Sequence, residues 1–238
     1  MPSYRLSEPV IAAFVVIPVA LAVTLAWATL TAWRRSGASE PASRRASVIV
    51  AADAAAWMVL TWAAAMSGIL QQWDLRPPPF LFVILGTILI SLLLAFGGVG
   101  TRLAQYMPLW TLVAIQSFRL PLELAMHALS ERGIMPIQMS YSGRNFDIVT
   151  GATAILVAIL VKTGHGGRRL VMLWNVLGLA LLTNVVSVAI ASMPLFRAFG
   201  DDRVVTFVTY TPFVWLPAVM VLAALAGHLV IFRALRRL

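Results

Sequence analysis

The chain has 238 residues, of which 61% are hydrophobic and only 11% are charged. The apolar residues fall in long blocks, so the composition predicts an all-α, polytopic membrane protein without a separate soluble domain. The absence of cysteine excludes disulfides, thiolate metal sites and cysteine nucleophiles. The net charge of +9 comes from basic residues at the ends of apolar blocks, where they contact lipid headgroups. We therefore expect membrane lipids as partners, and no nucleic acid.

Seven apolar segments predict a seven-transmembrane-helix bundle that forms one domain over residues 1–238. The expected spans are 9–33, 47–71, 79–97, 107–128, 148–163, 170–192 and 207–232. The fifth span is short, because the fourteen residues between Asp147 and Lys162 make only about 21 Å of helix. It therefore requires a thinned or protein-shielded position.

The charges between the segments predict the orientation of the bundle. If the chain crosses the membrane seven times, one side carries eleven basic residues and one acidic residue. The other side, which includes Arg5, carries six basic and six acidic residues. Because cytoplasmic loops are rich in Lys and Arg, we expect the N-terminus outside and the C-terminus in the cytoplasm. Alanine and arginine dominate over a single lysine, a bias that favours a bacterial protein and hence the inner membrane.

The fourth segment carries a stripe of polar side chains within an arc of about 80°. Its members are Gln116, Arg119, Glu123 and His127. Arg119 and Glu123 are four residues apart and can pair, which leaves guanidinium donors and a carboxylate oxygen free. Pro121 lies between them and crowds the carbonyl of Ser117, which predicts a kink. Charges beside a broken helix at mid-membrane are typical of transporter sites. The alternative is a structural ion pair that holds the fourth helix to its neighbours.

The loop 129–147 is too apolar for a solvated linker. Its polar candidates are Tyr141, Arg144, Asn145 and Asp147. One interpretation is a lid that folds over the stripe, and the other is an amphipathic segment resting on the outer leaflet.

Two further groups of polar residues accompany the stripe. Asp53, Asn175 and His228 share a depth near the cytoplasmic face, and we expect an inner polar cluster in which hydrogen bonds reduce the cost of burying Asp53. The alternative is a proton relay. Toward the exterior, Asn184, Tyr210 and Trp215 are candidates to face the stripe, although Tyr and Trp also serve as interfacial anchors.

Cofactor chemistry finds no support in the sequence, and we expect neither a cofactor nor a metal. The single lysine, Lys162, stands at a helix end, which excludes a retinal Schiff base. His127 and His228 are expected at different depths, which argues against a bis-histidine haem. Glu123 and His127 could supply two metal ligands, but a third and a fourth from other helices cannot be nominated.

These patterns favour a protein that binds a small polar or anionic molecule at the stripe and transports or senses it. Arg119 would hold the anionic group, while Glu123 would orient the arginine and exchange a proton with His127. One alternative is an intramembrane enzyme acting on a lipid or isoprenoid, with His127 or Glu123 as acid or base. Another is a scaffold subunit of a membrane complex. No residue is assigned as catalytic.

Overall fold

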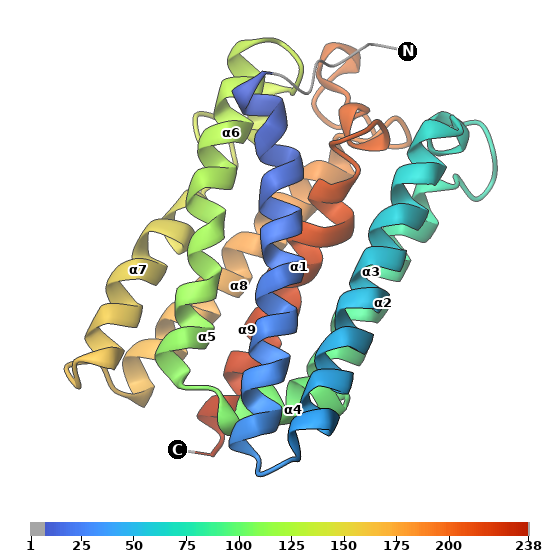
Figure 1. Ribbon diagram of the computed structural model, residues 1–238. Helices are drawn as coiled ribbons and strands as arrows, with labels where there is room; N and C mark the ends of the chain where they lie inside the picture. Colours follow the sequence, from blue (N-terminus) through green and yellow to red (C-terminus); the bar gives the residue numbers. More distant parts are fainter. Residues whose placement is uncertain (1–7, 238) are drawn as a thin grey trace.

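The computed structural model describes residues 8–237, and these residues form an all-α bundle without β-strands. Long helices run side by side between two ends joined by turns (Figure 1). The helices are α1 (Pro9–Arg35), α2 (Glu40–Met66), α3 (Phe80–Phe96), α4 (Gly98–Tyr106), α5 (Leu109–Ile115), α6 (Arg119–Glu131), α7 (Ile148–Lys162), α8 (Arg168–Ala191) and α9 (Leu222–Leu235). The 3-10 turns are Ile69–Gln71, Gln116–Phe118, Ile137–Met139, Asp201–Arg203 and Phe207–Thr209, and a π-helix, Leu216–Val221, leads into α9. The predicted all-helical class is confirmed.

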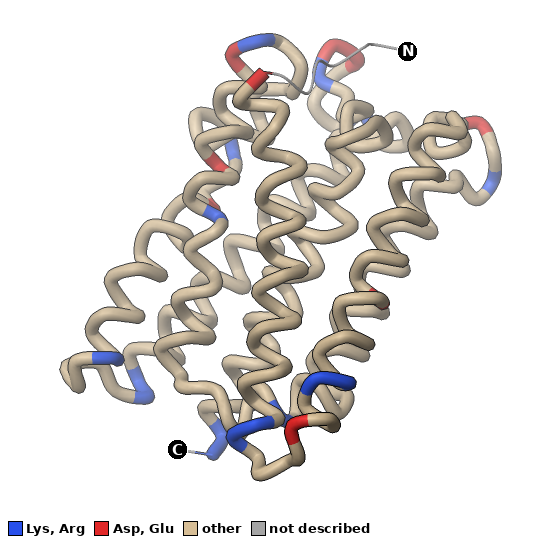
Figure 2. The backbone as a smooth tube through the Cα atoms, in the orientation of Figure 1, with Lys and Arg blue, Asp and Glu red and all other residues tan. Residues whose placement is uncertain are grey.

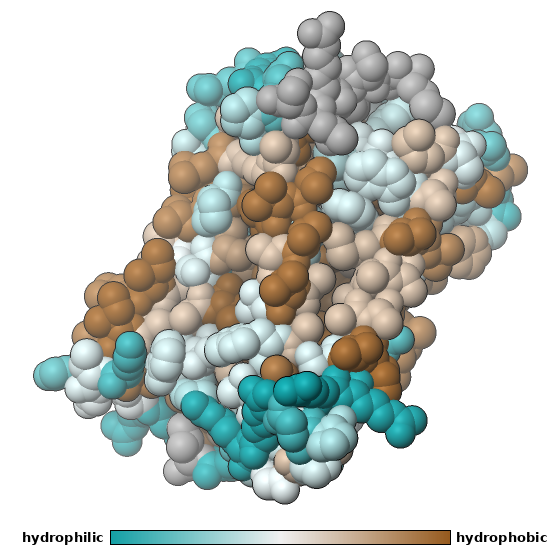
Figure 3. Space-filling model, in the orientation of Figure 1, coloured by the Kyte–Doolittle hydropathy of each residue, from teal (hydrophilic) through white to brown (hydrophobic). Residues whose placement is uncertain are grey.

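Four of the described helices are long and apolar enough to cross a membrane. They are α1, α2, α8 and the continuous stretch Leu216–Leu235. A fifth span results if α3 and α4, which meet at a bend of 52°, are counted together. Large apolar side chains such as Val59 and Leu173 are exposed on the outer surface. On the face drawn in Figure 3, apolar residues fill the middle and hydrophilic residues gather toward the two ends. The protein is therefore a helical membrane protein.

Two predicted helix starts lie far from those of the structure. The second helix begins at Glu40 and not at 47, because its first turns are polar and hydropathy detects only the apolar part. Pro41 occupies the first turn, where proline suits a helix, and Glu40 pairs with Arg34 and Arg44. The last long helix begins at Leu216 and not at 207. Pro212 disfavours helical backbone in the residue before it, and a 3-10 turn precedes that position.

The fourth predicted segment is a broken helix. It divides into α5, the 3-10 turn Gln116–Phe118 and α6. The turn includes Ser117, whose carbonyl would receive the missing hydrogen bond of Pro121 in a regular α-helix. The helix is therefore irregular one turn before Pro121, and the kink itself stays a prediction.

The π-helix Leu216–Val221 is held by side chains from neighbouring helices. Widening of the helix leaves carbonyl groups without their usual partners. Trp57 Nε1 donates to the carbonyl of Ala218 at 2.8 Å, and Thr87 Oγ1 donates to that of Pro217 at 3.3 Å. These bonds tie the π-helix to α2 and α3.

The apolar core consists of two clusters with polar residues between them. On α8, one cluster includes Val171 and Trp174 and the other begins at Leu182. On the last helix, one cluster ends at Ala224 and the other begins at Val230. Gln116, Arg119, Asn175 and His228, all buried, belong to neither cluster. The buried polar residues thus occupy the level where the apolar core is interrupted.

The two ends of the bundle differ in charge. Lys and Arg gather at one end, here called the basic end, which carries the turns 36–39 and 163–167 and residues 233–237 (Figure 2). The opposite end, the loop end, carries residues 132–147 and 192–215 and has charges of both signs. Arg5 lies outside the described residues.

Candidate functional site

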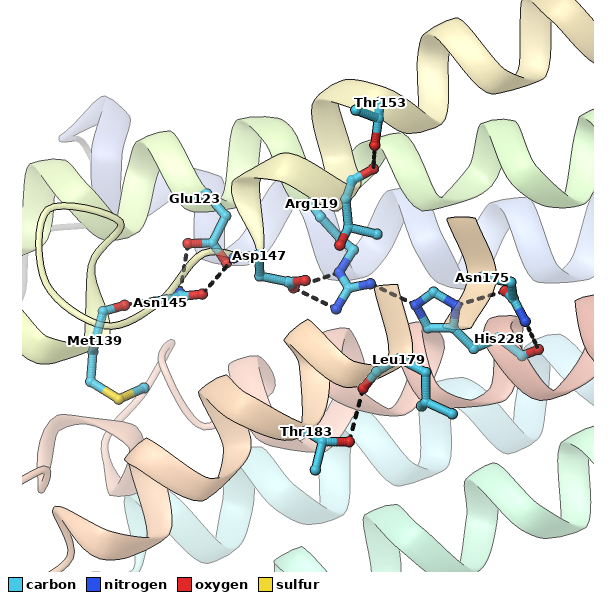
Figure 4. A network of polar contacts seen from close by, with 11 residues as sticks. Arg119, Glu123, Met139, Asn145, Asp147, Thr153, Asn175, Leu179, Thr183 and His228 are labelled. Atoms are coloured by element: carbon cyan, nitrogen blue, oxygen red, sulfur yellow. Dashed lines mark hydrogen bonds and ion pairs between the residues drawn. The ribbon is translucent and has the colours of Figure 1, made fainter. Parts of the chain in front are cut away.

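Arg119 is the centre of a buried hydrogen-bonded chain. The 3-10 turn ends directly before it, and its side chain is only 1% exposed. Its Nε donates to Asp147 Oδ2 at 2.6 Å, and its Nη2 lies 2.5 Å from the same oxygen. Its Nη1 lies 2.7 Å from His228 Nε2. The guanidinium therefore bridges the start of α7 to α9 (Figure 4).

The hydrogen bonds define the state of the His228 ring. An arginine can only donate, so Nε2 of His228 must accept from Arg119. The ring is then neutral, with its proton on Nδ1, 2.8 Å from Asn175 Oδ1. Asn175 Nδ2 donates in turn to the backbone carbonyl of His228 at 3.0 Å. The chain Asp147, Arg119, His228 and Asn175 thus has one consistent direction of donation from Arg119 outward.

Glu123 joins this chain through the loop and not through Arg119. Asn145 Nδ2 donates to Glu123 Oε2 at 2.7 Å and to the carbonyl of Met139 at 3.0 Å. Asn145 Oδ1 accepts from the backbone N–H of Asp147 at 3.0 Å. The predicted pair of Arg119 and Glu123 is therefore wrong, because a carboxylate 28 residues further along the chain reaches the guanidinium instead.

Two glycines make room for the network. A Cβ at Gly151 would collide with the backbone nitrogen of Leu120, so α7 packs directly against the first turn of α6. A Cβ at Gly178 would lie 2.6 Å from His228 Cε1. Close approach of helices at small residues is common in membrane proteins. Here it brings α6, α7, α8 and α9 together around Arg119.

His127 lies apart from Glu123, in contact with the loop. Its Nδ1 lies 2.9 Å from Ser140 Oγ, its Nε2 lies 3.4 Å from Glu131, and its ring stacks on Tyr141 with centroids 4.3 Å apart. The side chain is partly buried. The expected proton exchange between Glu123 and His127 has no direct contact to support it.

Arg144 and Asn184 meet at the loop end. The backbone carbonyl of Arg144 accepts a hydrogen bond from Asn184 Nδ2 at 2.7 Å. The guanidinium carbon of Arg144 lies 5.1 Å from the centroid of the Phe199 ring. Together with Asn145 and Asp147, these contacts show that the loop folds back onto the bundle beside the stripe. Whether it opens and closes as a lid stays a prediction.

Two aromatic candidates lie outside the network. Trp215 Nε1 donates to the carbonyl of Met58 at 3.0 Å, and its ring lies 4.8 Å from that of Trp62. Tyr210 follows the 3-10 turn Phe207–Thr209 and is half-buried. Among the described residues, neither side chain bonds to the stripe.

The expected inner cluster of Asp53, Asn175 and His228 is wrong in one member. Asn175 and His228 bond to each other, and His228 also bonds to Arg119. Asp53 is exposed and has no hydrogen bond or ion pair within the described part of the chain. The early start of α2 explains the error, because Asp53 is the fourteenth of the 27 residues of this helix and therefore sits at its middle.

The stripe itself divides between two cavities. The first, of about 130 Å³, is lined by Arg119, Glu123 and Asp147 together with apolar residues of α3, α6, α8 and the π-helix. Within it, Asp147 Oδ1 is buried without a hydrogen-bond partner among the described residues. Gln116 lines a separate cavity of about 430 Å³. The 3-10 turn between Ile115 and Arg119 thus directs neighbouring polar side chains to different spaces.

No group of three or more His, Asp or Glu residues suited to a metal ion occurs in the stretch 8–237. Compared with known proteins, the chain matches no protein-family model, no curated protein and no solved structure.

Proposed function

We propose that the chain is a seven-span protein of a bacterial inner membrane, with its N-terminus outside and its C-terminus in the cytoplasm. The count takes the broken helix from Leu109 to Glu131 as one span and includes the short helix α7. The concentration of Lys and Arg at the basic end supports the orientation. The loop end then faces the exterior.

We further propose that the first cavity binds a small molecule with an apolar body and a polar or anionic group, which the protein transports or senses. One observation carries this function: Arg119, Glu123 and Asp147 stand together on the wall of an otherwise apolar cavity inside the membrane domain. Apolar pockets with a few convergent polar groups are the usual form of small-molecule sites. Ionisable residues inside a membrane domain are functional by default.

The size of the cavity limits the ligand. Its volume of about 130 Å³ is close to that of a protein cavity that holds one benzene molecule. A ligand of roughly six to eight non-hydrogen atoms therefore fits without further opening. Short-chain carboxylates belong to this class.

Asp147 determines when Arg119 is free to bind an anion. One base and two acids line the cavity, so their formal charge is −1 when all three are ionised. An anionic ligand must compete with Asp147 for the guanidinium. Release of Asp147 would also free the start of α7 and the loop before it, which offers a route from ligand binding to a change of shape. Glu123, which also lines the cavity, is the candidate for proton exchange.

The test uses hexanoate and its neutral counterpart hexan-1-ol, titrated calorimetrically into purified full-length protein. We expect hexanoate to bind wild type and to lose at least tenfold in affinity in Arg119→Gln. Hexan-1-ol should show little difference between the two. Arg132→Gln is the matched control, because Arg132 is an exposed arginine paired with Glu8. Equal hexanoate binding by wild type and Arg119→Gln would contradict the proposal.

A purely structural role for the network is the second candidate. It is favoured by the internal pairing of Arg119, since both Asp147 and His228 already contact the guanidinium. In that case Arg119→Gln would lower thermal stability, and neither hexanoate nor a co-purified ligand would bind wild type. Detection of specific hexanoate binding separates the two functions.

A further inference from the structure

The larger cavity lies between α1, α2, α3 and the helix that ends the bundle. Its volume is about 430 Å³, roughly three times that of the first cavity. Most of its wall is apolar, and its polar side chains include Thr24, Asp53 and Gln116. It shares no ionisable residue with the first cavity.

Gln116 is an unpartnered amide in the wall of this cavity. The residue is fully buried, and neither its Oε1 nor its Nε2 has a hydrogen-bond partner among the described residues. A Cβ at Gly227 would collide with Gln116 Nε2, so the glycine makes the space that the amide occupies. Buried amides without partners are rare because their desolvation is costly. A bound molecule with hydrogen-bonding groups would satisfy this one.

Asp53 brings a carboxylate to the same cavity. It is the middle residue of α2, and it makes no ion pair within the described residues. A carboxylate at the centre of a membrane helix is expensive unless it meets a partner. The Asp53 carboxylate would pair with a cationic group of a ligand. The apolar wall of the cavity would contact an apolar part of the same ligand.

We propose that this cavity is a binding site for a lipophilic amine. The protonated nitrogen would pair with the Asp53 carboxylate, Gln116 would accept a hydrogen bond through Oε1, and the apolar body would lie along α1, α3 and the last helix. The depth of Asp53 favours a free amphiphile over the amino headgroup of a membrane lipid, because headgroups stay at the bilayer surface. This site is independent of the function proposed for the first cavity.

The experiment measures equilibrium binding of tritiated dodecylamine to the full-length protein by scintillation proximity, with tritiated dodecan-1-ol as the neutral match. We expect Asp53→Asn to weaken amine binding at least tenfold and to leave alcohol binding unchanged. Asp74→Asn removes the same charge from an exposed loop and is the control that should behave as wild type.

Gln116→Leu supplies a second readout, with an expected loss of threefold or more for the amine. Undiminished amine binding by Asp53→Asn overturns the proposal. Equal affinity for amine and alcohol in wild type also overturns it and assigns the cavity to acyl chains. Hexanoate binding by wild type is measured separately, so failure of the first site and failure of this one are distinguishable.

Discussion

The two cavities place ionisable residues in opposite situations. In the first, Arg119 is buried against Asp147 and His228, so each charge or ring has an internal partner. In the second, Asp53 and Gln116 line one space without partners in the described part of the chain. A ligand of the first cavity would therefore have to compete with an internal partner, whereas a ligand of the second would meet groups that no side chain satisfies.

Substitution of Arg119 tests the first cavity, in which the charges are paired. Arg119→Met leaves Asp147 buried without its counter-ion, and loss of one partner of a buried pair costs about 3 to 5 kcal/mol. We expect that decrease in the free energy of unfolding, measured in mixed detergent micelles. Asp53→Asn should not lower the free energy of unfolding, because the exposed carboxylate forms no hydrogen bond or ion pair within the described residues.

A double variant makes the same comparison stricter. Replacement of both members of a buried pair by apolar residues is often close to neutral. Arg119→Met combined with Asp147→Leu should therefore recover most of the lost stability. A double variant as unstable as the sum of the two single variants would argue that the pair is not the source of the effect.

The glycine that faces His228 allows a smaller and more local test. In Gly178→Ala the new Cβ would lie 2.6 Å from His228 Cε1 and 2.8 Å from Thr150 Cγ2. Overpacking costs about 1 to 3 kcal/mol, whereas alanine gains about 1 kcal/mol of helix propensity. We expect a net loss of about 1 kcal/mol in the free energy of unfolding.

Gly98→Ala is the matched control for this variant. A Cβ at Gly98 would meet only the end of the Arg102 side chain, at 3.9 Å, and the residue is the first of α4. Its substitution should change stability by less than about 0.5 kcal/mol. A loss of similar size in both variants would contradict tight packing around His228.

Much of the fold followed from local patterns. Apolar blocks located the helices, and Pro121 located the break in the fourth segment. The start of α2 was missed because its first turns are polar, and the residues before Leu216 were wrongly assigned to a helix. The count of seven spans and their orientation stay predictions.

The sequence predicted several residues of the candidate site but not their hydrogen-bond and ion-pair partners. The periodicity of the fourth segment identified Arg119 and Glu123, but the partners Asp147 and His228 come from distant parts of the chain. Sequence spacing favours the i, i+4 pair of Arg119 and Glu123, because it carries information about contacts within one helix and not between helices. The 3-10 turn also rotates Gln116 into a different cavity, a change that a regular 100° step does not predict.

The glycines around the network are a weak signal in the sequence. Gly151, Gly178 and Gly227 stand on three successive helices, and each faces a side chain or backbone of the network or of Gln116. Small residues at helix contacts are common enough that none of them alone indicates a site. Their shared target becomes visible only in three dimensions.

The central claim is that Asp147 and an anionic ligand compete for Arg119, and the most direct measurement is the hexanoate affinity of Asp147→Asn. The asparagine keeps the size of the side chain and removes the competing charge. We expect hexanoate to bind this variant about tenfold more tightly than wild type, a difference of about 1.4 kcal/mol. Unchanged or weaker hexanoate binding by Asp147→Asn would show that Asp147 and the ligand do not compete for Arg119.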